Sequence, residues 1–348
     1  MKDPDYNRII ESLDERKIAR SAAKGQISSI QFWQPNYQPP LLERIDGLCR
    51  KYGVHVQVRF YHHLKEGFDA AILRYLPSVQ NLAVDCLEHI ENEDQMATLA
   101  HLRRLSFQVQ GLDRPEFLSA LNLTDVEVLT LPATRKANLD LEPVSRARRL
   151  RKLTVEGHRR GIESLSEAPR LEELILWAQP KSRSLAFLGN VPALRILKII
   201  RGGRETLDDV RHGTLEFLNI TWVNGLRDLG PIRRFPKLQG LIVSDQIRVQ
   251  SIDLTGAPIK FLALDDCKNL AKVLGLGDSA QLEHFTAIRS ALPLDELRDR
   301  RWPASLRVLR LWSSNMKWNK ATRLKLDTLG YQEAGERWPQ SDLDEVHG

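Results

Sequence analysis

Three short clusters in this sequence carry side chains that could do chemistry. Paired imidazoles can bind a transition metal, adjacent carboxylates can bind a cation, and closely spaced glycines can cradle a phosphate. The clusters are the pair His62 and His63, the run Asp265, Asp266 and Cys267, and the glycines Gly275 and Gly277.

The spacing within each cluster argues against these functions. Neighbouring residues on a strand face opposite ways, so the two histidines cannot both bind one metal, and we expect a loop pair at a strand end. Two adjacent carboxylates lack the six or more oxygens of a calcium site, which favours a solvated turn. The glycines lack a third glycine and a strand–turn–helix setting, which indicates a turn between repeats.

No other catalytic motif replaces them. The sequence contains no GxSxG, GxxxxGK[ST], HExxH or CxxC. We therefore predict no catalytic residue, no metal site and no cofactor, and a protein that is not an enzyme.

A short sequence motif repeats along the chain, and the strands that it predicts must position all of these side chains. The stretch RLEELIL at residues 170–176 has the pattern LxxLxL, and similar stretches return every 21 to 24 residues. A short period repeated this often indicates a solenoid. The first apolar residues of the eleven motifs are Val79, Leu102, Val126, Leu150, Leu171, Leu194, Leu215, Leu238, Ile259, Leu282 and Leu306.

This pattern resembles the leucine-rich-repeat family. The stretch NGLRDLGPIRRFPKLQGLIV looks most like the subtype of about 22 residues found in internalins and in a class of phosphatase regulators. The resemblance implies an α/β fold: a right-handed, horseshoe-shaped solenoid with a parallel β-sheet on its concave face and short helices or turns on its convex face.

Three segments are expected within one continuous domain. Residues 77–311 form the solenoid of about eleven repeats, and residues 1–76 form an N-terminal α/β cap with degenerate repeat units. Within that cap we predict a polar helix over 1–24, strands over 27–33 and 54–60, and a helix between these strands. Residues 312–348 form a C-terminal cap whose last ten residues are frayed.

The segments between motifs hold two further patterns. A proline precedes five of the motifs and should end a short helical turn: Pro169, Pro192, Pro236, Pro258 and Pro303. The family usually places asparagine or cysteine eight residues after the first leucine, and of the positions compared only Cys267 matches. Other contacts must then join neighbouring turns, and we expect a less regular solenoid. The positions without asparagine or cysteine are Gln110, His158, Gln179, Gly202, Val223, Gln246 and Ser290.

The register predicts which side chains face the concavity. The motif leucines should be buried, including Leu153, Leu174, Leu197, Leu218, Leu241 and Leu262, and the alternate residues then point outward. In the C-terminal half these outward residues are unusually apolar, which favours a protein-docking surface with Trp177 as its anchor. Tight curvature or the C-terminal cap could instead cover them. The predicted partner-binding residues are Ile175, Trp177, Ile196, Ile200, Phe217, Ile242, Phe261 and Trp312.

A basic cluster is the competing feature. A solvated edge is its favoured interpretation, a patch for an acidic protein comes second and nucleic acid third, because no aromatic residues are interleaved for base stacking. Its members are Arg146, Arg148, Arg149, Arg151, Lys152, Arg159 and Arg160.

Composition narrows the function. The chain has 348 residues, of which 42% are hydrophobic and 28% charged, with a net charge of +6. Three distant cysteines, no signal peptide and no membrane-length apolar run indicate a cytoplasmic protein.

We expect a non-catalytic scaffold or adaptor that binds a partner protein on its concave face. The alternatives are an antitoxin or immunity-type inhibitor that plugs a partner enzyme, and binding of an anionic polymer through residues 146–160. Neither nucleic acid nor membrane is expected as a partner. The oligomeric state stays open, with a monomer favoured.

Overall fold

The structure is a computed structural model that describes residues 6–8, 13–33, 35, 37–63, 67–135, 138–277 and 279–333. These residues form two compact units, which meet in sequence between Leu171 and Glu172. We call them the N-terminal unit and the C-terminal unit and describe each by itself. The predicted frayed tail lies outside the described residues.

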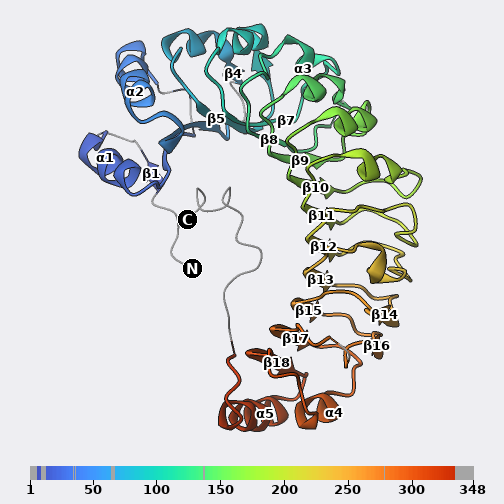
Figure 1. Ribbon diagram of the computed structural model, residues 1–348. Coiled ribbons are helices and arrows are strands. Elements are labelled where there is room, and N and C mark those ends of the chain that lie inside the picture. The colour runs from blue at the N-terminus through green and yellow to red at the C-terminus, as the bar shows by residue number, and fades with distance from the viewer. Residues whose placement is uncertain are drawn as a thin grey trace. The chain divides into compact units, whose positions relative to one another are not determined.

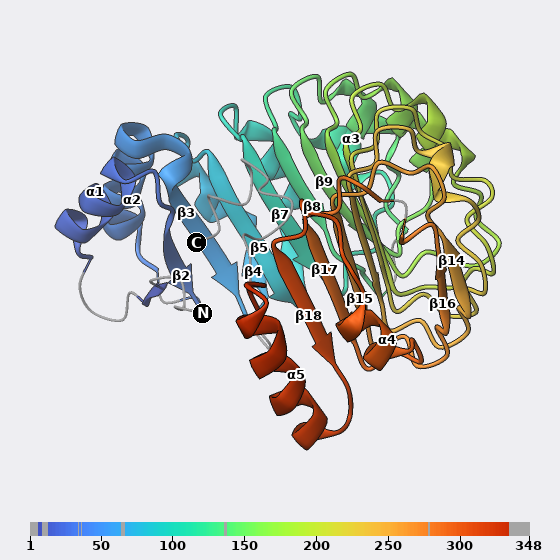
Figure 2. The same cartoon turned by 60° about the horizontal axis from the view of Figure 1, so that its bottom comes forward.

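The N-terminal unit holds seven parallel sheet strands in the order β1-β2-β3-β5-β7-β8-β9, of which Figure 2 labels β2 to β9. Its strands are β1 (Tyr6–Arg8), β2 (Ser28–Phe32), β3 (Val56–Tyr61), β5 (Asn81–Leu87), β7 (Arg104–Val109), β8 (Val128–Leu131) and β9 (Lys152–Glu156). Short helices lie between them: α1 (Glu15–Ala23), α2 (Pro39–Tyr52), α3 (Phe117–Ala120) and the 3-10 turns η1 (Gly53–His55), η2 (Ala70–Tyr75), η3 (Glu93–Thr98), η4 (Glu142–Arg146) and η5 (Ile162–Glu167). A small second sheet pairs β4 (Phe68–Asp69) with β6 (Ile90–Glu91).

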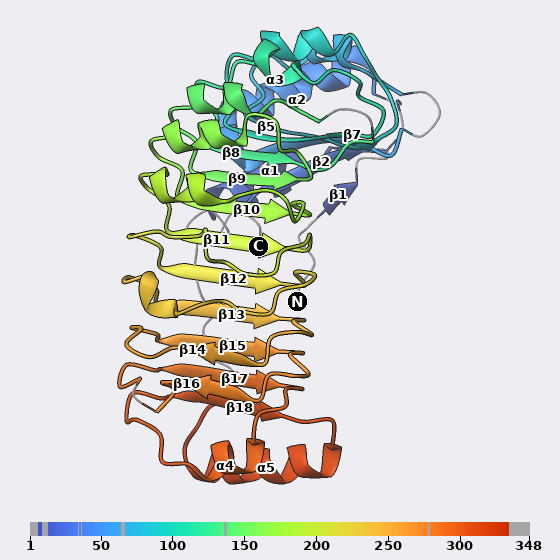
Figure 3. The same ribbon diagram turned by 90° about the vertical axis from the view of Figure 1, so that its right-hand side faces the viewer.

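The C-terminal unit repeats this architecture with the strand order β10-β11-β12-β13-β15-β17-β18 (Figures 1 and 3). Its strands are β10 (Glu173–Trp177), β11 (Ile196–Ile200), β12 (Phe217–Thr221), β13 (Gly240–Ser244), β15 (Phe261–Asp265), β17 (His284–Ile288) and β18 (Val308–Trp312). The connections hold η6 (Ala186–Asn190), η7 (Ile232–Arg234), α4 (Leu294–Asp299) and α5 (Met316–Thr328), and a second small sheet pairs β14 (Ser251–Asp253) with β16 (Lys272–Leu274).

The motif fixes where each of these strands begins. In all eleven repeats the strand starts two residues after the first apolar residue, as Glu173 follows Leu171. The next motif leucine then faces the core, and all six leucines named above are at most 1% exposed. The parallel strands, their register and the buried leucines confirm the leucine-rich-repeat fold in both units.

The prolines end helical turns in four of the five cases. Pro169, Pro192, Pro236 and Pro303 follow η5, η6, η7 and α4. The prediction is wrong at Pro258, because the preceding segment forms β14 instead. There the backbone N–H of Thr255 donates to Asp253 Oδ1 over 2.9 Å, an Asx turn that competes with helix.

The N-terminal cap contains the predicted strands and the helix between them. Helix α2 starts with two prolines and ends at Gly53, whose φ of 58° suits glycine. A helix throughout residues 1–24 is wrong, since α1 covers only Glu15–Ala23 and Tyr6–Arg8 pairs with β2 as a strand. The side chain of Asp14 accepts a hydrogen bond from the N–H of Lys17 and so begins the helix.

Buried polar side chains do join the turns, as expected where asparagine is missing. His158 accepts from the N–H of Leu139 over 3.1 Å, and its Nε2 lies 3.0 Å from the carbonyl of Pro132. Cys267 donates to the carbonyl of Val243 in the preceding repeat, whereas Gln246 donates to the carbonyl of Ser244 within its own repeat. Chemically different residues thus fill one structural position, which explains why the sequence pattern there is irregular.

Candidate docking surface

One face of the C-terminal sheet carries the predicted partner-binding residues. We call it the open face and define it by the outward residues of strands β10 to β18. Strand pairing aligns them in three rows. The first row is Glu173, Ile196, Phe217, Gly240, Phe261, His284 and Val308. The second is Ile175, Lys198, Asn219, Ile242, Ala263, Thr286 and Arg310. The third is Trp177, Ile200, Thr221, Ser244, Asp265, Ile288 and Trp312.

The structure brings most predicted partner-binding residues together on this face. Seven of the eight are partly exposed, namely Ile175, Trp177, Ile196, Ile200, Ile242, Phe261 and Trp312. Phe217 differs, with an exposed fraction of 2%, so it supports the surface from below and offers little area to a partner. Trp312 lies on β18, at the other end of the sheet from Trp177.

A regular backbone feature ends the strands of this face. The residue after each of six consecutive strands has a positive φ, between 49° and 58°, although none of them is glycine. Each donates its backbone N–H to the last carbonyl of the next strand, over 2.8 to 3.0 Å. These residues form a fourth row, which we call the edge row: Ala178, Arg201, Trp222, Asp245, Asp266 and Arg289.

Two tryptophans flank an arginine at this edge. The guanidinium carbon of Arg201 lies 5.6 Å from the ring centroid of Trp177 and 5.0 Å from that of Trp222. Both distances are within the range of cation–π attraction. The exposed fraction of Trp222 is 52%, so this cluster places a large aromatic surface and a positive charge beside the apolar rows.

The other cation near Trp177 is neutralised. Lys198 Nζ lies 2.7 Å from Glu173 Oε1, and the Glu173 side chain is almost fully buried. Removing either partner would leave the other charge poorly solvated. This pair therefore belongs to the framework of the open face.

Acidic residues follow further along the same edge. Asp266 and Arg289 form a two-pronged ion pair, with Arg289 Nε 2.5 Å from Asp266 Oδ1. Burial raises the pKa of Asp265 to about 6 although the charge of Arg310 lowers it, and the Asp265 Oδ1 has no hydrogen-bond partner among the described residues. The edge thus changes from cationic and aromatic at Arg201 to acidic at Asp245 and Asp265.

A neutral histidine borders the apolar rows. The rings of Phe261 and His284 lie 4.3 Å apart, and His284 Nε2 is 3.0 Å from Thr286 Oγ1. Burial lowers the pKa of His284 to about 4, so its ring is uncharged at neutral pH. The surface around Phe261 is therefore aromatic without being cationic.

The clusters that could do chemistry have structural roles. His62 and His63 follow strand β3; His62 is exposed, whereas His63 is buried with its Nδ1 2.9 Å from the Tyr61 carbonyl. Cys267 is buried in the core, and burial raises the pKa of its thiol to about 12. Gly275 forms a turn with a φ of 72°. Among the described residues no group of three or more histidines, cysteines or acids could hold a metal ion.

The basic cluster is largely matched by acids. Arg149 lies 3.2 Å from Asp125, and Arg160 lies 2.9 Å from Asp140. Arg146 lies 3.4 Å from Glu142, and Lys152 is buried. These pairs reduce the positive potential that a polyanion would need.

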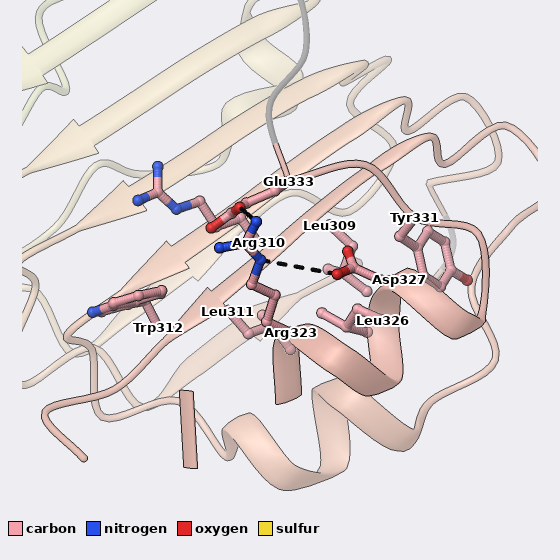
Figure 4. Close-up of a pocket in the computed structure, with 9 residues that line it drawn as sticks. All are labelled: Leu309, Arg310, Leu311, Trp312, Arg323, Leu326, Asp327, Tyr331 and Glu333. Atoms are coloured by element: carbon pink, nitrogen blue, oxygen red, sulfur yellow. Dashed lines mark ion pairs between the residues drawn. The ribbon is translucent and has the colours of Figure 1, made fainter. Parts of the chain in front are cut away.

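A small pocket lies between β18 and the C-terminal helix α5, and its lining includes Trp312, Arg323 and Leu326 (Figure 4). Arg323 lies 2.9 Å from Glu333 and 3.9 Å from Asp327. Both carboxylates that line the pocket therefore lie within ion-pair distance of Arg323. No described helix is both long enough and apolar enough to cross a bilayer.

Sequence reasoning missed Arg201 and Trp222. Both follow a strand, outside the alternation that defines the outward rows. A comparison of the seventh residue after each first leucine would have found them, because that position recurs as Ala178, Arg201, Trp222, Asp245, Asp266 and Arg289.

Comparison with known proteins gives resemblance in structure alone. No family model matches the sequence, and no curated protein matches it. An internalin from Listeria monocytogenes is 15% identical over 71% of this chain and 77% of its own, with a TM-score of 0.42. The mouse RP105/MD-1 complex is 14% identical over 88% of this chain and 64% of that chain, with a TM-score of 0.44. A leucine-rich-repeat protein from Leptospira interrogans is 12% identical over 85% of this chain and 98% of its own, with a TM-score of 0.34.

Proposed function

We propose that this leucine-rich-repeat chain is a non-catalytic scaffold or adaptor that binds a partner protein on the open face of its C-terminal unit. The observation that carries the proposal is the apolar surface around Trp177. Ile175 and Ile200 adjoin this tryptophan on β10 and β11, and Trp222 extends the surface through Arg201. A contiguous apolar patch on a protein surface is typical of an interaction site.

The surroundings of this patch fit interface anatomy. Protein interfaces combine an apolar centre rich in tryptophan and arginine with a polar rim. Here Asn219 and Thr221 on β12 and the Glu173–Lys198 pair border the apolar side chains. An inhibitor that plugs a partner enzyme is the special case in which the bound protein is catalytic.

Binding of an anionic polymer through residues 146–160 has less support. Three of its arginines lie beside carboxylates, as described above. A polyanion would have to displace these acids before it reached the arginines. The apolar face requires no such exchange of charge partners.

A quantitative pull-down from the native host tests the proposal. The wild-type chain and the variants Trp177→Ala and Trp33→Ala would each be used as bait. Trp33 is the matched control, because it is 46% exposed and lies in the N-terminal unit. We expect a partner that Trp177→Ala loses and Trp33→Ala keeps. Partners that all survive Trp177→Ala would refute docking at this face.

A further inference from the structure

Three neighbouring residues of the edge row carry a charge pattern that the docking proposal does not use. Arg201, Trp222 and Asp245 follow the adjacent strands β11, β12 and β13 (Figure 3). Neighbouring strands lie about 4.8 Å apart, which places the backbones of Arg201 and Asp245 about 10 Å apart. The exposed indole of Trp222 separates the positive from the negative side chain.

Neither Arg201 nor Asp245 forms an ion pair among the described residues, although Arg201 contacts the two indole rings. Within the described part of the chain, no oppositely charged side chain lies within ion-pair distance of Arg201 or of Asp245. Further along the same edge, Asp266 and Arg289 follow adjacent strands and pair with each other. In the edge row, Asp266 and Arg289 therefore neutralise each other, whereas the charged groups of Arg201 and Asp245 are available to a ligand.

We infer that this edge binds an extended segment of the partner protein that carries an acidic residue and a basic residue three positions apart. The inference rests on the proposed docking at the open face and names the chemistry of the partner. The guanidinium of Arg201 lies over the rings of Trp177 and Trp222, and its N–H groups can donate to a carboxylate of the segment. Asp245 accepts the basic side chain.

The spacing follows from the geometry of an extended chain. A polyproline-II segment rises about 3.1 Å per residue with three residues per turn. Residues three apart therefore point the same way and lie about 9 Å apart, close to the separation of Arg201 and Asp245. The two residues between them lie about 120° further round the helix, so the flank of the segment, rather than a side chain aimed at it, contacts Trp222.

The same charges disfavour a polyanion at this edge. A nucleic-acid backbone presents several phosphates in a row and needs several cations. Next to Arg201, Lys198 is already paired with Glu173, and the carboxylate of Asp245 would repel a neighbouring phosphate. A peptide segment with one carboxylate and one cation is complementary to Arg201 and Asp245.

Peptide selection tests the inference directly, because the partner does not have to be identified first. A displayed library of random dodecapeptides would be selected on the full chain and on the variants Arg201→Glu and Asp245→Arg. The control is Arg233→Glu, an equal charge reversal at an exposed residue of the turn η7. Wild type and control should enrich an acid and a base three positions apart. Arg201→Glu should enrich two bases at that spacing, and Asp245→Arg two acids.

Affinities of the selected peptides complete the test. We expect Arg201→Glu and Trp222→Ala each to weaken the best wild-type peptide about tenfold or more. Peptides that need Trp177 but ignore both charge reversals would overturn the charge pattern while keeping the docking face. Peptides insensitive to Trp177→Ala would overturn both proposals. No enrichment above the starting library would overturn the inference.

Discussion

Single residues at the strand ends hold the least favourable backbone conformations of the C-terminal unit. A left-handed conformation costs a non-glycine residue roughly 1 kcal/mol or more. Arg201, Trp222 and Asp245 nonetheless adopt it, each donating its N–H to the next strand. This geometry turns their side chains out of the alternation of the strands, which is why Arg201 can lie between two indoles.

Trp177→Ala tests the anchor of the docking surface. Trp177 faces outward on β10 and is partly exposed, so its loss should change the free energy of unfolding by about 1 kcal/mol or less. Partner affinity should fall by about 2 kcal/mol or more, as for an interface hot spot. Urea unfolding and titration calorimetry would measure the two effects.

Iodide quenching provides a second measure of Trp177. In a variant with the other six tryptophans replaced, its fluorescence should be quenched in the free chain and protected after partner binding. Full protection in the free chain, together with a loss of several kcal/mol in stability, would identify Trp177 as a packing residue.

Asp265→Asn tests the half-buried carboxylate at the end of β15. Burial raises the pKa of Asp265 to about 6 from an ordinary value near 4, so the unfolded state releases this proton more readily. Ionisation therefore destabilises the fold above pH 6, and the effect fades as pH falls towards 4. At pH 7.5 the variant should be more stable by about 1 kcal/mol, allowing for partial solvent screening.

Thermal unfolding of both proteins at several pH values would measure the effect. The stability difference between Asp265→Asn and wild type should shrink between pH 6 and pH 4. An equal difference at pH 7.5 and pH 4 would show that ionisation of Asp265 is not its cause.

At the scale of one strand, Leu218→Ala tests the register of the sheet. Leu218 lies on β12 and is fully buried, so truncation should cost about 2–5 kcal/mol. Each repeat is stabilised mainly by its neighbours, so unfolding should spread to the strands on either side. Hydrogen exchange would show the spread. Asn219→Ala, on the outward side of the same strand, should cost much less.

At the scale of one turn, Gly202→Ala tests the contact between neighbouring repeats. Gly202 has a φ of 80°, and a Cβ there would lie 2.3 Å from the Gln179 carbonyl oxygen. The backbone would have to move, so we expect a loss of roughly 3 kcal/mol or more. Gly256→Ala is the control, because its φ of 72° is similar and no atom lies within 4 Å of the added Cβ. It should lose only about 1 kcal/mol, and equal losses would remove the steric explanation.

At the scale of the whole molecule, basic and acidic residues are nearly equal in number. The net charge of +6 arises from 51 basic and 45 acidic residues, many of which pair in the structure. A protein with this balance has little general attraction for polyanions. A partner would then be recognised by a local surface, and the open face is the surface that we propose.

The salt dependence of partner binding tests this conclusion. Burial of apolar surface is weakly sensitive to salt, whereas release of counterions from many phosphates is steeply sensitive. Between about 50 and 200 mM NaCl, we expect partner affinity to change less than tenfold, against roughly 10³-fold or more for a protein with many phosphate contacts. A steep slope, abolished by Arg148→Ala with Arg159→Ala, would transfer the function to the basic cluster.

The sequence by itself determined the repeat, the strand positions and the buried leucines. Alternation has a period of two, so one buried leucine such as Leu174 fixes the direction of every side chain in its strand. That logic correctly placed Ile175, Trp177 and Ile200 on one face. It could not indicate that Phe217 would be covered, because coverage depends on the size and rotamers of residues on neighbouring strands.

Only the tertiary structure decided what lies beside Trp177. Arg201 and Trp222 are 24 and 45 residues further along the sequence, and the parallel register brings all three to one edge. The left-handed backbone after each strand sets their direction, and no alternation rule covers that position. Local sequence patterns report which side of a strand a residue occupies. Contacts across strands depend on how successive turns stack, which is a property of the folded chain.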